Sequence, residues 1–221
     1  MKTERYVVCQ CSYREIQGLI ETKHYLKRRP YVTDSFALYD RETRHIVGAL
    51  TIGKPASNSL CVGVCGAEAK QYVYELNRLY VEDGVDFPES KFISASISLF
   101  QRTFGNAILV SYANTDMGHV GAIYQASNWL YTGKTPSRTD KFVPEGKHSR
   151  HYDKDQDNSV RVVRSSKHRY VMFVGTKGFK KWCMARLQYK VADYPKADLR
   201  FYDEDFKYEK KLVFNKQVGE V

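Results

Sequence analysis

The order of strand-like and helix-like segments constrains this chain more than any other feature. Residues 5–12 are rich in β-forming side chains, and residues 13–27 carry apolar residues at helical spacing. The pattern then predicts strands at 35–39 and 45–52, a long strand at 71–81, a helix at 90–102, a strand at 106–112 and a helix at 118–129. This order predicts a layered α+β or α/β domain, with α+β preferred, in which helices cover the faces of a mostly antiparallel sheet.

The chain changes character after residue 133. Residues 134–221 hold 21 Lys or Arg and 12 Asp or Glu, a net charge of +9, whereas the whole chain carries +10. We therefore expect a core domain at residues 1–133 and a basic C-terminal extension, residues 134–221, packed on it. Within this extension we expect a strand at 169–174, a short helix at 178–187 and an exposed polar loop at 148–158.

The sequence predicts a cytoplasmic protein that does not span a membrane. It has no run of about 18 apolar residues, and residues 1–10 lack an apolar signal core. An odd and sparse set of cysteines is typical of reduced thiols. A four-thiolate zinc site is the alternative, but neither close pair has the usual two-residue spacing, and both pairs stand in strand-like segments. We expect buried free thiols at Cys9, Cys11, Cys61, Cys65 and Cys183.

The positive charge favours a polyanionic partner, with nucleic acid first and an anionic membrane second. The alternative is a basic protein without such a partner. Residues 161–190 hold nine Lys or Arg and no acid, and aromatic residues lie between them. Basic side chains neutralise phosphates, and aromatic rings stack on an extruded base. The predicted DNA contacts are Arg161, Arg164, Lys167, Arg169, Lys177, Lys180, Lys181 and Arg186.

Three blocks carry the chemistry: the strand at 75–81 with the helix start at 88–94, the strand at 108–112, and the helix at 118–129. A helix N-terminus offers unpaired N–H groups and suits a phosphate. Ser90 is the expected N-cap of the helix that starts in the first block.

This succession resembles the acyl-CoA-binding core of the GCN5-related N-acetyltransferase superfamily. The resemblance implies that acetyl-CoA lies between two splayed strands and that Tyr124 protonates the departing thiolate. The usual Gln/Arg-x-x-Gly-x-Gly/Ala phosphate loop is missing, and residues 89–93 stand in its place. The implied cofactor contacts are Arg78, Leu79, Tyr80, Val81, Ser90, Lys91, Phe92, Ile93 and Ser94.

The motifs resemble the Mom family of phage DNA-modification proteins more closely, over residues 16–196. The most specific match is Gly-His-x-Gly-x-x-Tyr-Gln-Ala-x-Asn-Trp at 118–129. Supporting matches are His-Tyr-Leu at 24–26, Glu-Leu-x-Arg-Leu at 75–79, Glu-Ser-x-Phe-Ile-Ser at 89–94 and Tyr-Pro-Lys at 194–196. The resemblance implies conversion of adenine N6 in DNA to a methylcarbamoyl derivative, which shields phage DNA from restriction. It implies acetyl-CoA as a ligand and bound iron.

The resemblance also implies site residues. Tyr124 and His24 are candidate catalytic groups, and with Tyr39 they are candidate iron ligands. Asn114 stands where an aspartate is expected, and Asp116, two residues on, is its candidate substitute.

Each of these residues also has a structural interpretation. Tyr124 and Tyr39 are alternatively core tyrosines, and His24 is alternatively the solvated end of a basic helix. His119 is a further candidate for catalysis, and its alternative is a capping or packing residue. Arg78 is predicted to bind a phosphate or orient an acyl group. An ion pair with Glu75 is the alternative, but strict strand alternation puts these two residues on opposite faces.

The amine of adenine is buried in a paired duplex, so a flipped base in double-stranded DNA is the implied substrate. A methylcarbamoyl product needs a new bond at the acetyl methyl carbon, which is more than acyl transfer. Two alternatives remain: an ordinary N-acetyltransferase that acts on a protein or a small amine, and a DNA-binding protein without enzymatic activity.

Overall fold

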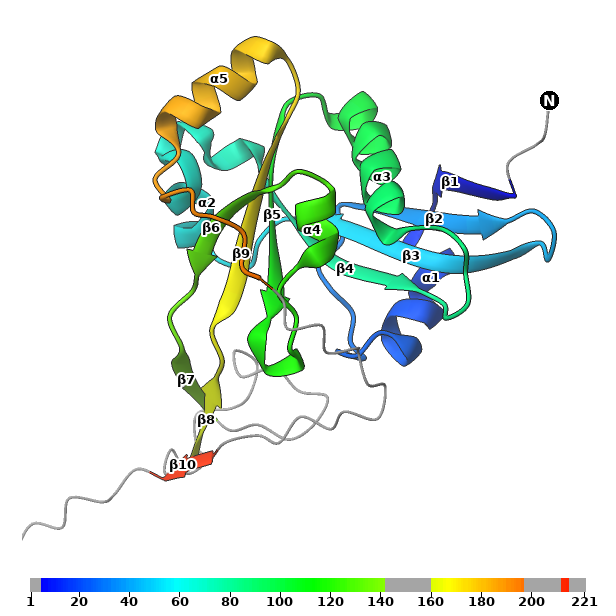
Figure 1. Ribbon diagram of the computed structural model, residues 1–221, viewed down its shortest axis with the longest axis horizontal. Helices are drawn as coiled ribbons and strands as arrows, with labels where there is room; N and C mark the ends of the chain where they lie inside the picture. Colours follow the sequence, from blue (N-terminus) through cyan, green and yellow to red (C-terminus); the bar gives the residue numbers. More distant parts are fainter. Residues whose placement is uncertain (1–4, 142–159, 197–211, 215–221) are drawn as a thin grey trace, which may run out of the picture. The chain divides into compact units, whose positions relative to one another are not determined.

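The computed structural model describes residues 5–141, 160–196 and 212–214 (Figure 1). The predicted polar loop at 148–158 lies outside these residues. The chain divides into two compact units. The first unit comprises Met1–Tyr112, Gly121–Gly133 and Arg169–Tyr194, and the second comprises Ala113–Val120, Lys134–His168 and Pro195–Val221. No helix within the described ranges is long and apolar enough to cross a bilayer.

A seven-stranded sheet is the main element. Its strands lie in the order β1-β2-β3-β4-β5-β9-β6. Strands β1 to β4 pair antiparallel, whereas β4 and β5 pair parallel. The mostly antiparallel sheet predicted from the sequence is thus confirmed. The strands are β1 (Tyr6–Gln10), β2 (Asp34–Asp40), β3 (His45–Gly53), β4 (Val73–Val81), β5 (Ala107–Asn114), β6 (Leu130–Lys134) and β9 (Lys167–Val174).

Five α-helices are described in these parts of the chain. They are α1 (Tyr13–Gly18), α2 (Asn58–Cys65), α3 (Glu89–Phe104), α4 (Ala122–Ala126) and α5 (Lys177–Arg186). A π-helical turn at Leu19–Lys23 continues α1, and 3-10 turns lie at Ala67–Tyr72 and Thr115–Met117. A second, antiparallel sheet has the order β10-β8-β7, formed by β7 (Arg138–Lys141), β8 (Val160–Arg164) and β10 (Leu212–Phe214).

Strand alternation explains why helices lie on both faces of the main sheet. Ala37 on β2 pairs with Ala49 on β3, and both pack under Ile16 and Ile20 of the α1 segment. Phe36 and its neighbour Leu50 point to the other face and are also fully buried. Helix α3 contacts β1 and β2, and Figure 1 shows it on the side of the sheet away from α1.

Helix α2 was not predicted, because its sequence NSLCVGVC is rich in strand-forming residues and follows a loop-like segment. Ser57 caps it by accepting the Leu60 N–H at 3.3 Å. The expectation that Cys61 and Cys65 stand in a strand is therefore wrong, since both lie on α2. Cys61, Cys65 and Cys183 are buried free thiols as expected, but Cys9 is exposed and Cys11 is only partly buried.

Two expectations about helix starts are also wrong. Helix α3 begins at Glu89, after Pro88 in the N-cap position, so Ser90 is not the cap. The helix predicted at 118–129 shrinks to α4, because the chain adopts left-handed backbone at Gly118 (φ 67°) and Gly121 (φ 79°). At Gly121 a Cβ atom would collide with a ring carbon of Tyr170, so this approach requires glycine.

Candidate active site

Strands β4 and β5 separate after three paired residues, and this opening is the candidate active site. Pairing runs from Val73–Ile108 to Glu75–Val110 and stops there. Strand β4 then continues to Val81 with no ladder partner on its β5 side among the described residues, and the two strands diverge (Figure 1). The hydroxyl oxygen of Ser111, the first β5 residue beyond the paired segment, lies 2.8 Å from the Leu76 carbonyl oxygen. We call this opening the strand split.

Tyr124 reaches the strand split from α4. Its side chain is buried, and its hydroxyl oxygen lies 2.7 Å from the Ser111 hydroxyl. Burial raises the pKa of Tyr124 well above its usual range. The ring packs against Trp129 at 5.3 Å and Tyr170 at 5.2 Å between centroids. The phenol is therefore held protonated and fixed in place at the split.

An extra residue in β4 changes which side chains share a face of the sheet. Arg78 pairs with Thr51 and Leu76 pairs with the next residue, Ile52, so Asn77 is a bulge that has no register partner on β3. The simple alternation used in the sequence analysis does not hold across this bulge.

Arg78 is a buried cation without an ion pair within the described ranges. It is 8% exposed, and its Nη1 donates to the Asn77 carbonyl at 2.5 Å. Its Nε is buried and has no acceptor among the described residues. Burial lowers the pKa of Arg78, and so does the positive charge of Arg28. Because a desolvated charge is costly without a partner, an anionic ligand group would stabilise this side chain.

The predicted cofactor contacts fall into two groups. Leu79, Tyr80 and Val81 lie on the part of β4 beyond the split, and all are partly exposed. Phe92 and Ile93 at the start of α3 are fully buried, so their side chains belong to the core.

The exposed start of α3 is less suited to a phosphate than predicted. The N–H groups of Lys91 and Phe92 donate to the Pro88 carbonyl, and Glu89 places a negative charge in the first turn. The Ser94 hydroxyl donates to the Ser90 carbonyl at 2.8 Å.

His24 is buried and stacks on Tyr25, with 4.4 Å between ring centroids. Its Nδ1 accepts the Leu26 N–H at 3.1 Å. In a neutral imidazole the proton is therefore on Nε2, which makes that atom a donor and not a metal ligand.

The donor set does not fit the iron site that the resemblance implies. Tyr39 is half-buried in β2, and burial favours the neutral phenol of Tyr124 over the phenolate that a metal needs. In the part of the chain that the structure describes, no group of three His, Cys, Asp or Glu residues stands together for a metal ion.

Asn114 and Asp116 belong to the second unit, where hydrogen bonds hold them in a short turn. The Asn114 Oδ1 accepts the Asp116 N–H at 3.3 Å and the Ser165 hydroxyl at 2.8 Å. Thr115 donates to the Ser166 carbonyl at 2.6 Å. His119 is half-buried, and burial lowers its pKa. Asn114 thus caps a 3-10 turn and ties it to the turn that precedes β9.

The predicted DNA-contact arginines on β8 and β9 are engaged within the protein. Arg161 donates to Thr139, and Arg164 donates to Asp140, both at 3.0 Å, in the second unit. In the first unit Arg169 donates to Thr132, and its guanidinium lies 3.3 Å from the centroid of the Tyr189 ring.

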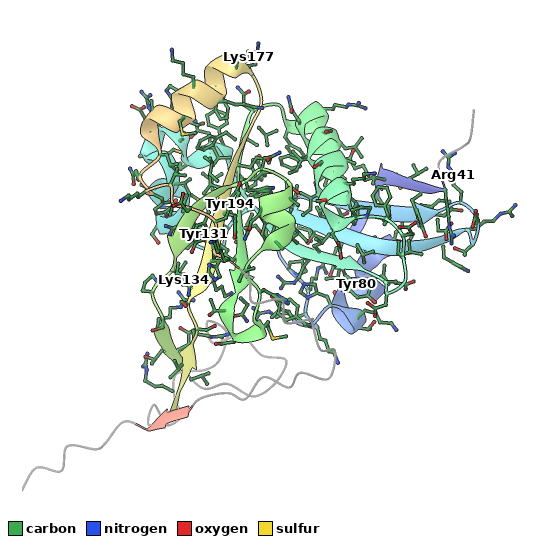
Figure 2. All side chains as sticks on the ribbon, in the orientation of Figure 1. Arg41, Tyr80, Tyr131, Lys134, Lys177 and Tyr194 are labelled. Atoms are coloured by element: carbon green, nitrogen blue, oxygen red, sulfur yellow. The ribbon has the colours of Figure 1, made fainter. Side chains whose placement is uncertain are left out.

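Helix α5 presents basic side chains outward. Lys177, Lys180 and Lys181 are exposed and have no partner among the described residues, and Figure 2 shows Lys177 extending away from α5. Arg186 differs, since it pairs with Glu68 at 3.7 Å and lies 4.6 Å from the centroid of the Trp182 ring.

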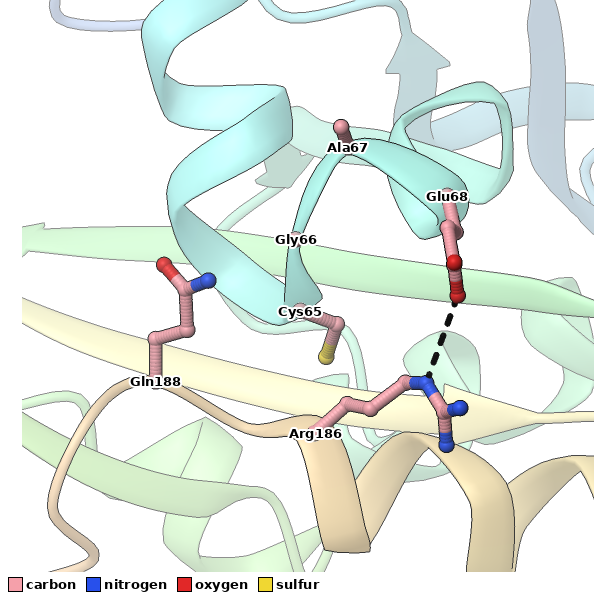
Figure 3. Close-up of a pocket in the computed structure, with 6 residues that line it drawn as sticks. All are labelled: Cys65, Gly66, Ala67, Glu68, Arg186 and Gln188. Carbon is pink, nitrogen blue, oxygen red and sulfur yellow. Dashed lines mark ion pairs between the residues drawn. The ribbon is translucent and has the colours of Figure 1, made fainter.

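A pocket of about 390 Å³ lies between the ends of α2 and α5, and the Arg186–Glu68 ion pair crosses it (Figure 3). It contains none of the predicted catalytic residues. Its lining consists of Cys65, Gly66, Ala67, Glu68, Arg186 and Gln188.

The described residues form an α+β protein with a mixed sheet, whose single described parallel pair opens at a buried tyrosine. The chain belongs to the Mom protein family, whose family model matches residues 5–196. It is 28% identical over 196 residues to the protein named methylcarbamoylase mom of Escherichia phage Mu, a match that covers 80% of this chain and 78% of that protein.

The solved structures that resemble this chain include acetyltransferases, at low sequence identity. A putative acetyltransferase from Acinetobacter baylyi ADP1 has a TM-score of 0.47 at 9% identity, covering 80% of this chain and 96% of that one. A phosphinothricin acetyltransferase from Sinorhizobium meliloti, in complex with acetyl-CoA, has a TM-score of 0.48 at 8% identity, covering 78% and 90%.

Proposed function

We propose that this protein is a DNA-modifying transferase that converts adenine N6 in DNA to a methylcarbamoyl derivative with acetyl-CoA as the donor. Family membership supports the proposal most strongly, because the phage Mu relative is named a methylcarbamoylase. In this proposal the modification takes place in the cytoplasm of the host cell and shields phage DNA from restriction.

The strand split supports the choice of donor. Beyond Leu76 the β5-facing edge of β4 has no ladder partner among the described residues, so an extended ligand with amide groups would find backbone partners there. Arg78 would gain a counter-charge from an anionic group of the same ligand. Acetyl-CoA, when bound, supplies an activated two-carbon group.

Tyr124 has the position and the protonation state of an acid at this site. Because its pKa lies well above the usual range, the phenol keeps its proton at neutral pH. It is thus ready to donate to a negative charge that develops in the split, such as that on a departing thiolate. Ser111 and the packed rings of Trp129 and Tyr170 fix its direction.

The basic surface supports DNA as the acceptor. A duplex buries the amine of adenine, so the base must be flipped out of the stack. The α5 lysines Lys177, Lys180 and Lys181 are our proposed contacts to phosphates, since their charges are free of protein partners in the described parts. Arg186 on the same helix adds to this positive charge, and Arg161, Arg164, Lys167 and Arg169 stay predicted DNA contacts.

The test is mass spectrometry of nucleosides from plasmid DNA, after expression of the wild type or Tyr124→Phe in bacteria. We expect a new, heavier deoxyadenosine with the wild type and its loss with the variant. If folded wild type binds CoA but leaves adenine unmodified, the protein is an ordinary N-acetyltransferase on a protein or small amine. Salt-sensitive DNA binding without thermal stabilisation by CoA identifies a DNA-binding protein without enzymatic activity.

A further inference from the structure

Three oxygen atoms form a row at the strand split. The Ser111 hydroxyl oxygen lies 2.7 Å from the Tyr124 hydroxyl and 2.8 Å from the Leu76 carbonyl. Ser111 is 1% exposed, and the Tyr124 side chain is 7% exposed. The row begins one residue beyond the last paired residues of β4 and β5, where the ladder gives the Leu76 carbonyl no amide partner on β5.

A serine hydroxyl has one proton, and a carbonyl oxygen only accepts. Ser111 is placed to donate to both the Leu76 carbonyl oxygen and the Tyr124 oxygen, so its single proton serves one of them at a time. While Tyr124 is neutral, the Leu76 carbonyl competes for that proton, since a buried carbonyl without a partner is costly.

We propose that Ser111 is a positioning residue that makes the buried Tyr124 a usable acid. When Tyr124 gives its proton to an acceptor such as a thiolate in the split, the Ser111 hydroxyl rotates from the Leu76 carbonyl to the Tyr124 oxygen. The proton of Tyr124 ends on the thiolate, the negative charge ends on the Tyr124 oxygen, and Ser111 donates to that charge. No other bond forms or breaks.

Burial makes it harder for Tyr124 to release its proton. A fully buried phenolate has lost its hydration, which opposes release of the proton. A hydrogen bond to a charged group is stronger than one to a neutral carbonyl, so the rotation of Ser111 recovers part of the loss. The Leu76 carbonyl gives up its bond while Tyr124 is charged.

The test measures the ionisation of Tyr124 directly. A polyfluorinated tyrosine is incorporated at position 124, because electron-withdrawing fluorines bring its pKa into a range that the folded protein tolerates. Fluorine NMR then follows its titration in the protein alone. We expect Ser111→Ala to lower the ionisation constant ~10-fold, because the phenolate loses its donor.

Ser96 provides the matched control. It is equally buried, and its hydroxyl has no partner among the described residues, so Ser96→Ala removes a buried hydroxyl without touching the row. The titration should be unchanged in this variant. Ser111→Cys keeps the volume filled with a weak donor and should give an intermediate value, which covers the case that Ser111→Ala fails to fold. An unchanged titration in Ser111→Cys and Ser111→Ala overturns the proposal.

A second arm rests on the proposed function. Ser111→Ala should lower kcat for DNA modification without changing KM for the donor, and should have no further effect in a Tyr124→Phe background. Full additivity would show that Ser111 acts independently of Tyr124. Since the fluorine titration needs neither DNA nor donor, it can succeed where DNA modification fails, so the two proposals fail separately.

Discussion

Glu75 and Arg78 lie on the same face of the sheet, although strict alternation along β4 would separate them. Glu75 pairs with Gly53 and Arg78 pairs with Thr51, and these two β3 residues are two positions apart. The bulge at Asn77 shifts the alternation by one residue. Beside the larger effect of burial, the carboxylate of Glu75 raises the pKa of both Arg78 and Tyr124. Glu75 thus joins the candidate site, which the sequence pattern did not indicate.

Replacing Arg78 should affect the free energy of unfolding and the binding of the donor in different ways. Arg78→Met fills a similar volume and removes a desolvated charge that has no ion pair within the described ranges. We expect the free energy of unfolding to stay constant or rise by up to ~2 kcal/mol, while donor binding is abolished. Urea denaturation and CoA titration measure the two effects, with the exposed Arg102→Met as control. A large loss of stability with donor binding intact would make Arg78 a structural residue.

Gly121 and Gly118 form a natural pair for testing how α4 is positioned. Both have positive φ, but a Cβ at Gly121 would collide with Tyr170, whereas none of the described atoms lies within 4 Å at Gly118. Gly118→Ala should cost about 1 kcal/mol of stability for its backbone conformation. Gly121→Ala should cost more and should also lower DNA modification, since Tyr170 packs on Tyr124. Equal costs in denaturant unfolding would show that the collision is relieved without consequence.

The Arg5–Asp40 ion pair predicts an acid-sensitive step in stability. Asp40 is buried, and the hydrogen bond from Arg5 lowers the pKa of its carboxyl from 3.8 to about 2. The folded state therefore binds this proton less readily than the unfolded chain does. Its stabilising contribution is complete above about pH 4 and disappears as the pH falls towards 2. Asp40→Asn should make the melting temperature depend less on pH in this window. An unaltered dependence on pH would contradict the assignment.

The α5 lysines should determine how DNA binding depends on salt. Substituting Lys177, Lys180 and Lys181 by Gln should reduce the slope of log K against log salt by about 0.9 for each phosphate that is no longer neutralised. Fluorescence anisotropy with a labelled duplex measures the slope. A control with the same change in net charge replaces the exposed Arg41, Lys70 and Arg102 by Gln. Equal effects of the two triple variants would indicate that only net charge matters.

The main strands of the first unit were predictable because each is a short run of β-forming residues bounded by turn residues. Helix α5 also matched, starting at Lys177 against a predicted 178. Helix α2 was not predictable, since its alternation of Leu, Val and Cys resembles a strand, and only packing against β4, β5 and α5 decides the matter. Gly121 shortened α4 through a close approach to Tyr170, a residue far away in sequence.

The candidate site was predictable where motifs carry it and not where geometry does. Tyr124 and Arg78 were identified from motifs. Tyr124 lies at the strand split, and Arg78 lies on β4 beyond it. Ser111 left one signal, a hydroxyl inside the otherwise apolar strand segment AILVSY. The contacts of Ser111 with Leu76 and Tyr124 depend on where β4 and β5 stop pairing. The local sequence does not indicate that position. The tautomer of His24 likewise depends on a backbone N–H that only the folded loop supplies.

Trp129 gives the site an optical reporter of its own. The chain has two tryptophans, and only Trp129 is fully buried, with its ring against Tyr124 and its indole N–H free of acceptors in the described parts. Such an indole emits at the blue end of tryptophan fluorescence and is quenched by charge that develops nearby. In a Trp182→Phe background, all tryptophan emission would come from the side chain next to Tyr124, so occupancy of the split could be followed without a label.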